Sequence, residues 1–369
     1  MYNNVLGFIL KRLILFICAI LFISCTNKPN AGPESISNYR LKFSKKSKLA
    51  SMPKGLYGMS SVNDGKYIYV INGIASNSPL RPVSIKNTRL NLVNRAIPNI
   101  NEIYAYNIVK DEWSSYPDRI SAKAYGNAEY IDGNIYIFNG QYRIKDGYSV
   151  HEGANKKVEI FDTKTIKISD LENNPHPAYH AWSSTWGNKI YVFGGSHSQS
   201  LISNYLLVYD PIKDDWFRLN DMPIRAQTRG EIVDGVLFTF GGYIGNSRKS
   251  KEIHSYNIAK DEWKYIGDMP NRLSANAICG NGDLIWLIGD YSNLSRVSVF
   301  DTKTNEFINI KTNLLGRRYA GAEIVGDKLY VFGGAKDSQN SFLSSIQVAD
   351  ITEIENLLSS NENSLNKEK

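Results

Sequence analysis

Residues 326–334 read GDKLYVFGG, which combines a tight turn, an alternating strand and a pair of glycines. The pattern recurs with substitutions, and its final glycine stands at positions 73, 140, 195, 242, 289 and 334. Asp-Gly and Gly-Asn pairs supply the positive-φ residues that tight hairpin turns require. Alternating aromatic and β-branched residues suit pleated strands that pack against other sheets. The six copies therefore predict six similar antiparallel sheets.

A second pattern follows these copies and ends in a tryptophan. It is clearest where a strand-like run that contains a tyrosine leads to Trp113, Trp216 or Trp263. One sheet of this size cannot bury both of its faces, so repeated sheets stack around an axis. Taken together, the repeats resemble the kelch motif over residues 41–351. This resemblance implies an all-β fold, namely a six-bladed kelch β-propeller.

The two ends of the repeat region differ in a way that predicts how the ring closes. The sixth copy lacks the tryptophan-to-Met-Pro ending, and Ile346–Asp350 runs directly into a polar segment. Residues 41–53 resemble such an ending with no repeat before them. We therefore expect residues 41–51 to form the outer strand of the last blade, which removes an open sheet edge. Residues 352–369 are expected to form a polar C-terminal tail with a short helix and a disordered end.

The N-terminal residues have the features of an export signal. Lys11 and Arg12 precede an apolar run at residues 13–23, which is too short to span a hydrocarbon core of about 30 Å. This predicts a secretory signal peptide at residues 1–24. The run Phe-Ile-Ser-Cys that ends at Cys25 resembles a bacterial lipoprotein box, which implies lipidation of Cys25. Residues 25–40 would then form a lipidated tether.

The alternative for this segment is an uncleaved N-terminal membrane anchor. Both alternatives predict an exported protein that is held at a membrane of the cell envelope. Lipidation would supply the two or more acyl chains that stable anchoring requires. Thr26 after Cys25 favours the outer membrane, with the propeller facing the periplasm or the cell surface.

Composition argues against several functional classes. The formal net charge is +7 over 369 residues and the lysines are scattered, so nucleic acid is not an expected partner. Of the three cysteines, Cys18 lies in the predicted signal peptide and Cys25 would carry lipid, which leaves Cys279. An intramolecular disulfide and a cysteine zinc site are therefore not expected. We expect no metal or other cofactor, and a monomeric protein.

Basic and aromatic residues recur at one predicted rim of the ring. In a four-stranded meander, the segment that enters the inner strand and the loop after the paired glycines lie at the same rim. A guanidinium group suits a carboxylate because it can bind both oxygens. Alternatively, these arginines pair with carboxylates of neighbouring blades and tie the ring together. The candidate ligand-binding residues are Arg225, Arg272, Arg317, Arg318, Tyr319, His180, Arg143 and Tyr243, and the same segments also carry Arg229 and Tyr291.

The first blade has an oversized loop at residues 74–101. Loops of this length without structure of their own tend to be functional or mobile. By its position in the repeat, the loop is expected to overhang the same rim. A partner contact, a lid and an insertion without function are all compatible with its sequence.

Two functions from different classes fit these features. The first is a binding module that holds a protein or carbohydrate ligand through the loop rim, where the basic residues would suit an anionic one. The second is enzymatic, because residues 282–300 resemble part of the N-acetylneuraminate epimerases, where an acidic residue follows a glycine. This resemblance implies that Asp290 is the acid/base and Arg296 the arginine of a sugar-acid isomerase. Asp290 stands where that family has glutamate.

Overall fold

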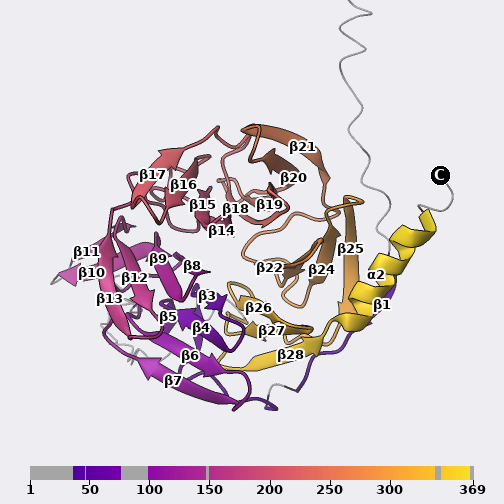
Figure 1. Ribbon diagram of the computed structural model, residues 1–369, viewed down its shortest axis with the longest axis horizontal. Coiled ribbons are helices and arrows are strands. Elements are labelled where there is room, and N and C mark those ends of the chain that lie inside the picture. Colours follow the sequence, from indigo (N-terminus) through magenta and orange to yellow (C-terminus); the bar gives the residue numbers. More distant parts are fainter. Residues whose placement is uncertain (1–35, 46, 76–98, 147–148, 337–341, 366–369) are drawn as a thin grey trace, which may run out of the picture.

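The computed structural model describes residues 36–45, 47–75, 99–146, 149–336 and 342–365. These residues form a ring of six small sheets around a central axis (Figure 1). Helix α2 (Thr352–Leu365) follows the last sheet at the edge of the ring. No helix among the described residues combines the length and apolar character needed to cross a membrane. The predicted signal peptide, Cys25 and most of the predicted 74–101 loop lie outside the described residues.

Each blade is an antiparallel meander with its first strand at the axis. Blade one contains β3 (Ser60–Asn63), β4 (Tyr67–Ile71), β6 (Ile103–Asn107) and β7 (Glu112–Tyr116). Blade two contains β8 (Asn127–Ile131), β9 (Asn134–Phe138), β12 (Val158–Asp162) and β13 (Lys167–Leu171). Blade three contains β14 (Trp182–Trp186), β15 (Lys189–Phe193), β16 (Leu206–Asp210) and β17 (Asp215–Arg218).

The second half of the ring repeats this arrangement. Blade four contains β18 (Gln227–Val233), β19 (Val236–Tyr243), β20 (Lys249–Asn257) and β21 (Glu262–Asp268). Blade five contains β22 (Ala277–Asn281), β23 (Leu284–Ile288), β24 (Val297–Asp301) and β25 (Glu306–Thr312). Blade six has β26 (Gly321–Val325), β27 (Lys328–Phe332) and β28 (Ile346–Asp350). Two short ribbons lie outside the blades: β2 (Leu56–Tyr57) with β5 (Ile74–Ala75), and β10 (Gln141–Asp146) with β11 (Ser149–Ala154).

Local backbone geometry explains why the repeated sequence pattern folds into hairpins. Between β18 and β19, Asp234 and Gly235 both have positive φ, 48° and 74°, as a type I′ turn requires. At the other end of β19, Gly242 has a φ of 101°. A Cβ atom there would lie 2.5 Å from the main-chain oxygen of Gln227. The second glycine of the pair is therefore required because two backbones meet at this point.

Apolar contacts between blades hold the ring together. The buried apolar side chains of the described residues form six clusters, and each cluster joins two neighbouring blades. In one of them Phe138 of blade two packs with Val192 of blade three. The innermost strands also contact both neighbours around the complete ring. The predicted six-bladed propeller is confirmed, and its core lies between the blades because each sheet buries both faces.

The N-terminal segment closes the ring, as predicted, but in a less regular way. Ser44 donates from its main-chain nitrogen to the carbonyl of Val348 at 2.8 Å, and Met52 donates in the same way to Ser344 at 2.8 Å. These residues therefore run antiparallel along β28 without forming a continuous strand. The regular strand is β1 (Ile36–Leu41), which pairs in parallel with β25 of blade five.

Burial explains why this segment is held in place. Leu41 and Phe43 lie in the cluster between blades five and six, whereas Met52 lies in the cluster between blades six and one. The segment therefore covers both flanks of the last blade. Strand β1 begins at Ile36, within the range assigned to the tether. In the C-terminal segment, α2 buries Ile354 in the first of these clusters.

Candidate functional site

A ring of left-handed residues lies around the axis, just before the inner strands. Gly58, Tyr125, His180, Ala275 and Tyr319 have φ values between 51° and 63°. Main-chain hydrogen bonds of 2.7 to 3.1 Å run from Gly58 to Tyr319, from Tyr125 to Gly58, from His180 to Tyr125, and from Tyr319 to Ala275. Each bond joins the start of an inner strand to that of another blade. The rings of Tyr125, His180 and Tyr319 contact one another at this level, and Tyr125 meets Tyr319 edge to face.

Blade four interrupts this ring. Its strand β18 has a register shift between Gln227 and Arg229, and no positive φ occurs in this segment. The guanidinium group of Arg229 spans the gap instead. Its Nη1 atom donates to the carbonyl of His180 at 3.4 Å, and its Nε atom donates to the carbonyl of Asn276 at 3.4 Å. A side chain thus replaces the main-chain bond, which leaves space beside it.

That space is a cavity of about 290 Å³, which we call the mouth pocket. Its walls combine aromatic rings with hydrogen-bonding groups, as is typical of ligand sites. The lining includes two cations and no carboxylate. The lining residues are His180, Gln227, Arg229, Tyr243, Ser247, Lys249, Ser274, Ala275, Tyr291 and Tyr319.

Arg229, which spans the gap, and His180 beside it are electrostatically unusual. Arg229 is only 8% exposed, and burial lowers its pKa to about 10. It forms no ion pair within the described part of the chain, and its guanidinium lies 4.6 Å from the ring centre of Trp182. Burial, together with the Arg229 charge, lowers the pKa of His180 to about 3, so its imidazole is neutral at pH 7. The buried Nδ1 atom of His180 has no hydrogen-bond partner among the described residues.

Several predicted rim residues do lie together. His180, Tyr243 and Tyr319 line the mouth pocket. Arg318 lies beside it, with its guanidinium 4.2 Å from the ring centre of Tyr291, a cation–π contact. Tyr291 is itself a lining residue.

Three other predicted arginines lie outside the pocket lining. Arg225 donates to the carbonyl of Ile202 at 3.3 Å, and Arg272 donates to the carbonyl of Lys249 at 2.7 Å. Arg143 pairs with Glu152 at 2.8 Å across the β10–β11 ribbon. Arg225 and Arg272 therefore connect neighbouring blades through main-chain carbonyls and not through carboxylates, as the alternative had it, and the carboxylate partner of Arg143 belongs to its own ribbon.

Arg317 does not face the rim and is fully buried. Its guanidinium donates to the carbonyls of Leu315 at 3.0 Å and Gly333 at 3.0 Å, and to the side-chain oxygen of Gln347 at 2.9 Å. Arg317 stands two residues before Tyr319, which is one of the left-handed residues around the axis. This position points its side chain into the blade, where it fixes the loops of blade six.

The acid and arginine of the isomerase alternative form an internal ion pair. Asp290 is fully buried, and its carboxylate accepts from Nε of Arg296 at 2.9 Å. The same carboxylate accepts from the main-chain nitrogen of Ser292 at 2.5 Å. Asp290 is absent from the pocket lining. In this arrangement its carboxylate holds a loop and does not reach the mouth pocket.

Sequence reasoning did not identify Gln227, Ser247, Lys249 or Ser274 as site residues. Lys249 opens strand β20, which is the third strand of its blade, and the rim argument considered only the two segments beside the paired glycines. One sequence signal was present. Blade six has Tyr319 and Ala320 between Arg318 and Gly321, whereas blade four has only Thr228 between Gln227 and Arg229, so one residue is missing where the left-handed geometry would occur.

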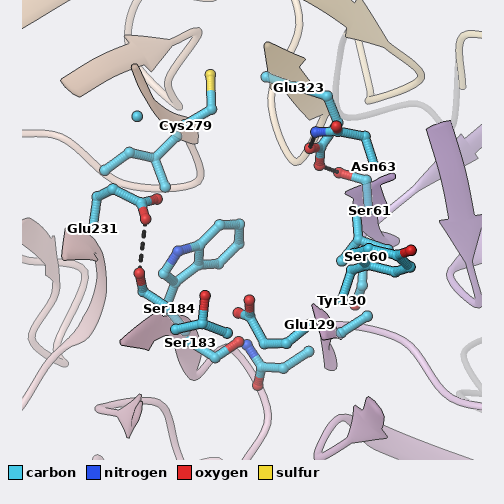
Figure 2. A pocket seen from close by; sticks show the side chains of 18 of the residues that line it. Ser60, Ser61, Asn63, Glu129, Tyr130, Ser183, Ser184, Glu231, Cys279 and Glu323 are labelled. Carbon is cyan, nitrogen blue, oxygen red and sulfur yellow. Dashed lines mark hydrogen bonds between the residues drawn. The ribbon is translucent and has the colours of Figure 1, made fainter. Parts of the chain in front are cut away.

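A second cavity lies deeper along the axis, between the inner strands. This channel cavity has a volume of about 240 Å³. Glu129, Glu231 and Glu323 face it from three sides, one in every second blade (Figure 2). Glu231 accepts from the hydroxyl of Ser184 at 2.7 Å, and Glu323 accepts from the hydroxyl of Ser61 at 2.6 Å.

The channel cavity has the opposite electrostatic character to the mouth pocket. Its lining contains no lysine, arginine or histidine. Burial, and to a smaller extent mutual repulsion, raises the pKa of Glu129 to about 8 and that of Glu231 to about 7. Burial also raises the pKa of Glu323. Among the residues that the structure describes, no three His, Cys, Asp or Glu lie close enough together to hold a metal ion.

We expect the free energy of unfolding to fall as the pH rises from about 5 to about 9. A carboxyl group whose pKa is raised by folding favours the folded state when protonated, and this stability is lost as the pH passes the folded-state pKa. Glu129→Gln stays neutral and should therefore be more stable than the natural protein by about 1–2 kcal/mol near pH 9, and similar to it near pH 5. Urea unfolding at both pH values measures this. The exposed Glu262→Gln is the control, and an unchanged pH dependence in Glu129→Gln would contradict the assignment.

Comparison with known proteins agrees with this architecture. The family model described as the KLHDC2/KLHL20/DRC7 Kelch-repeats domain matches residues 58–289. The chain belongs to the kelch-repeat family. Alpha-scruin of Limulus polyphemus is 25% identical to this kelch chain over 265 residues, which are 69% of the chain and 23% of scruin. Human Kelch-like protein 38 is 24% identical over 288 residues, which are 78% of the chain and 37% of that protein.

The kelch chain thus spans about a quarter to a third of the length of these relatives. Among solved structures, the one titled "Structure of YjhT" superimposes with a TM-score of 0.65 at 13% sequence identity. The match covers 81% of this chain and 95% of that one. At this level of identity the similarity shows the fold alone.

Proposed function

We propose that this kelch protein is a ligand-binding module of the bacterial cell envelope, and that its ligand occupies the mouth pocket. One observation carries the proposal: the axial ring is interrupted at blade four, and the gap is lined by aromatic and hydrogen-bonding side chains. Tyr243, Tyr291 and Tyr319 offer flat faces, while Gln227 and Ser247 offer hydrogen bonds. Such a lining suits part of a carbohydrate or a peptide side chain.

Aromatic truncation tests whether the mouth pocket binds the ligand. The purified full-length chain is applied to arrays of envelope glycans and of peptides, and the bound features are identified. Tyr243→Ala with Tyr291→Ala is expected to lower the affinity for them by about tenfold or more, because buried aromatic contacts dominate binding energy. Phe217→Ala is the control, since Phe217 is 40% exposed on the outer strand β17. Unchanged binding by the double variant would place the ligand elsewhere.

The sugar-acid isomerase remains the second candidate, because the mouth pocket holds two cations that suit an acidic sugar. The burial of Asp290 argues against the acid/base assigned to it by resemblance. We expect the purified protein to leave the anomeric exchange of N-acetylneuraminate at its spontaneous rate, as followed by NMR. Faster exchange that is abolished in Asp290→Asn would instead establish the enzyme.

The location at the envelope rests on the N-terminal sequence. We propose that the thiol of Cys25 carries the lipid that holds the propeller at the membrane, and that this is the outer membrane in a Gram-negative cell, as the residues around Cys25 predict. Cys25→Ser is expected to abolish incorporation of labelled palmitate and to release the protein from the membrane fraction. Cys18→Ser, inside the predicted signal peptide, is the matched control. Membrane retention of Cys25→Ser would favour the uncleaved anchor.

A further inference from the structure

We propose that the group recognised in the mouth pocket is a carboxylate, bound between the guanidinium of Arg229 and the ammonium of Lys249. This inference rests on the proposed function and names the chemistry of the ligand. Both cations line the same cavity, and they come from the first and third strands of blade four. A small organic acid, or the acidic group of a larger ligand, would place its charge there.

The first argument is the incomplete pairing of Arg229. A buried charge costs several kcal/mol unless it is paired and hydrogen-bonded. The guanidinium of Arg229 donates to three main-chain carbonyls, of Asn276, His180 and Thr228, at 3.2 to 3.4 Å, which is long for a charged donor. Within the described residues, its Nη2 atom donates to none. An anion at Nη2 would supply the missing partner.

The second argument is the absence of a competing carboxylate. No Asp or Glu lines the mouth pocket. Asp290 precedes the lining residue Tyr291, but its carboxylate is already bound by Arg296 and by the main chain of Ser292. The ammonium of Lys249 contacts only the hydroxyl of Ser292 among the hydrogen bonds within the described chain. The positive charge of the pocket is therefore not neutralised by its own walls.

The third argument concerns the shape and the remaining walls. A cavity of about 290 Å³ is at the small end for ligand sites, so it admits a compact group. Tyr243 and Tyr291 flank it, and Lys249 lies 5.8 Å from the ring centre of Tyr291. His180 adds no charge because its imidazole is neutral. One guanidinium with one open nitrogen and one ammonium match the two oxygens of a carboxylate.

Matched pairs of acids and amides test the proposal. Benzoate is compared with benzamide, and glucuronate with glucuronamide, by saturation-transfer NMR and titration calorimetry with the full-length chain. We expect the acids to bind and the amides to bind at least tenfold more weakly, because the amide lacks the charge that the cations recognise. Addition of salt to about 0.5 M should weaken the acids and leave the amides unchanged.

Substitutions at the two cations identify the anchor. Lys249→Gln is expected to lower acid affinity about tenfold without affecting the fold, because the side chain is only partly buried. Arg229→Lys keeps the charge but loses the planar donor, and it should lower acid affinity further. Lys260→Gln removes a charge from an exposed turn of the same blade and serves as the control. Circular dichroism verifies that each variant is folded.

The outcomes separate this inference from the proposed function. Acids that bind no better than amides, or that bind equally well to Lys249→Gln and Arg229→Lys, would overturn the carboxylate site. So would the absence of binding by either acid up to millimolar concentration. In those cases, loss of array binding by the Tyr243→Ala and Tyr291→Ala variant would still support the mouth pocket as a site for a neutral ligand.

Discussion

Replacement of Lys123 by methionine is expected to lower the free energy of unfolding by about 3–5 kcal/mol. Its ammonium lies 3.2 Å from the carboxylate of Glu159, and both side chains are almost fully buried, with 1% and 2% exposure. Removal of the lysine leaves the Glu159 carboxylate in a low-dielectric interior without its closest positive charge. Glu159 would retain bonds from Ser121 and a longer contact with Lys157. These remaining partners do not replace a buried counter-charge.

Two further variants test that explanation. Lys157→Met removes a 40% exposed partner of the same carboxylate, and we expect a loss of no more than about 1 kcal/mol. Lys123→Met combined with Glu159→Gln removes both charges, and it should recover a substantial part of the lost stability. Urea unfolding measures all three. A single Lys123→Met variant as stable as the natural protein would show that this pair does not stabilise blade two.

Gly289→Ala is expected to destabilise the propeller by about 4 kcal/mol or more, or to prevent folding. Gly289 has a φ of 64°, and a Cβ atom there would lie 2.2 Å from the main-chain oxygen of Arg317. That carbonyl belongs to the neighbouring blade, so relief of the clash requires two blades to separate. Gly289 also donates from its main-chain nitrogen to the carbonyl of Arg296 at 2.7 Å, which restricts local adjustment.

Gly282→Ala provides the matched control for this substitution. Gly282 has a φ of 54°, but nothing lies within 4 Å of the position of its Cβ. Only the cost of the left-handed backbone then remains, which is about 1–2 kcal/mol. Thermal unfolding of the two variants separates close contact from backbone strain. Equal losses at both positions would refute the close contact as the cause.

The blades were predictable because the signals for them are local. A pair such as Asp234-Gly235 determines a hairpin turn by its own backbone preferences, and the aromatic and β-branched residues beside it indicate a strand. The closure of the ring by the N-terminal segment was predictable, because the sixth repeat lacks the tryptophan-to-Met-Pro ending. The strand pairing of that segment was not. The parallel pairing of β1 with β25 depends on an edge contributed by a distant part of the chain.

The site was only partly predictable, because the direction of a side chain depends on its backbone. Arg317 and Arg318 are adjacent, yet one is buried in its blade and the other lies beside the mouth pocket. No property of the residue type distinguishes them. Similarly, Arg229 spans the gap in the axial ring because β18 has a register shift. That shift is recognised only when blade four is compared with the other blades.

The closure by residues 36–52 also determines how the molecule responds to mechanical load. Among the described residues, β1 is the first element that tension from the N-terminal side reaches, and β1 is attached to blade five. The following residues are attached to blade six through Ser44 and Met52. The force therefore acts on the contacts of residues 36–52 with blades five and six before it acts on the hairpins of any other blade. We therefore expect these contacts to govern resistance to pulling, with the other blades unfolding only after they have broken.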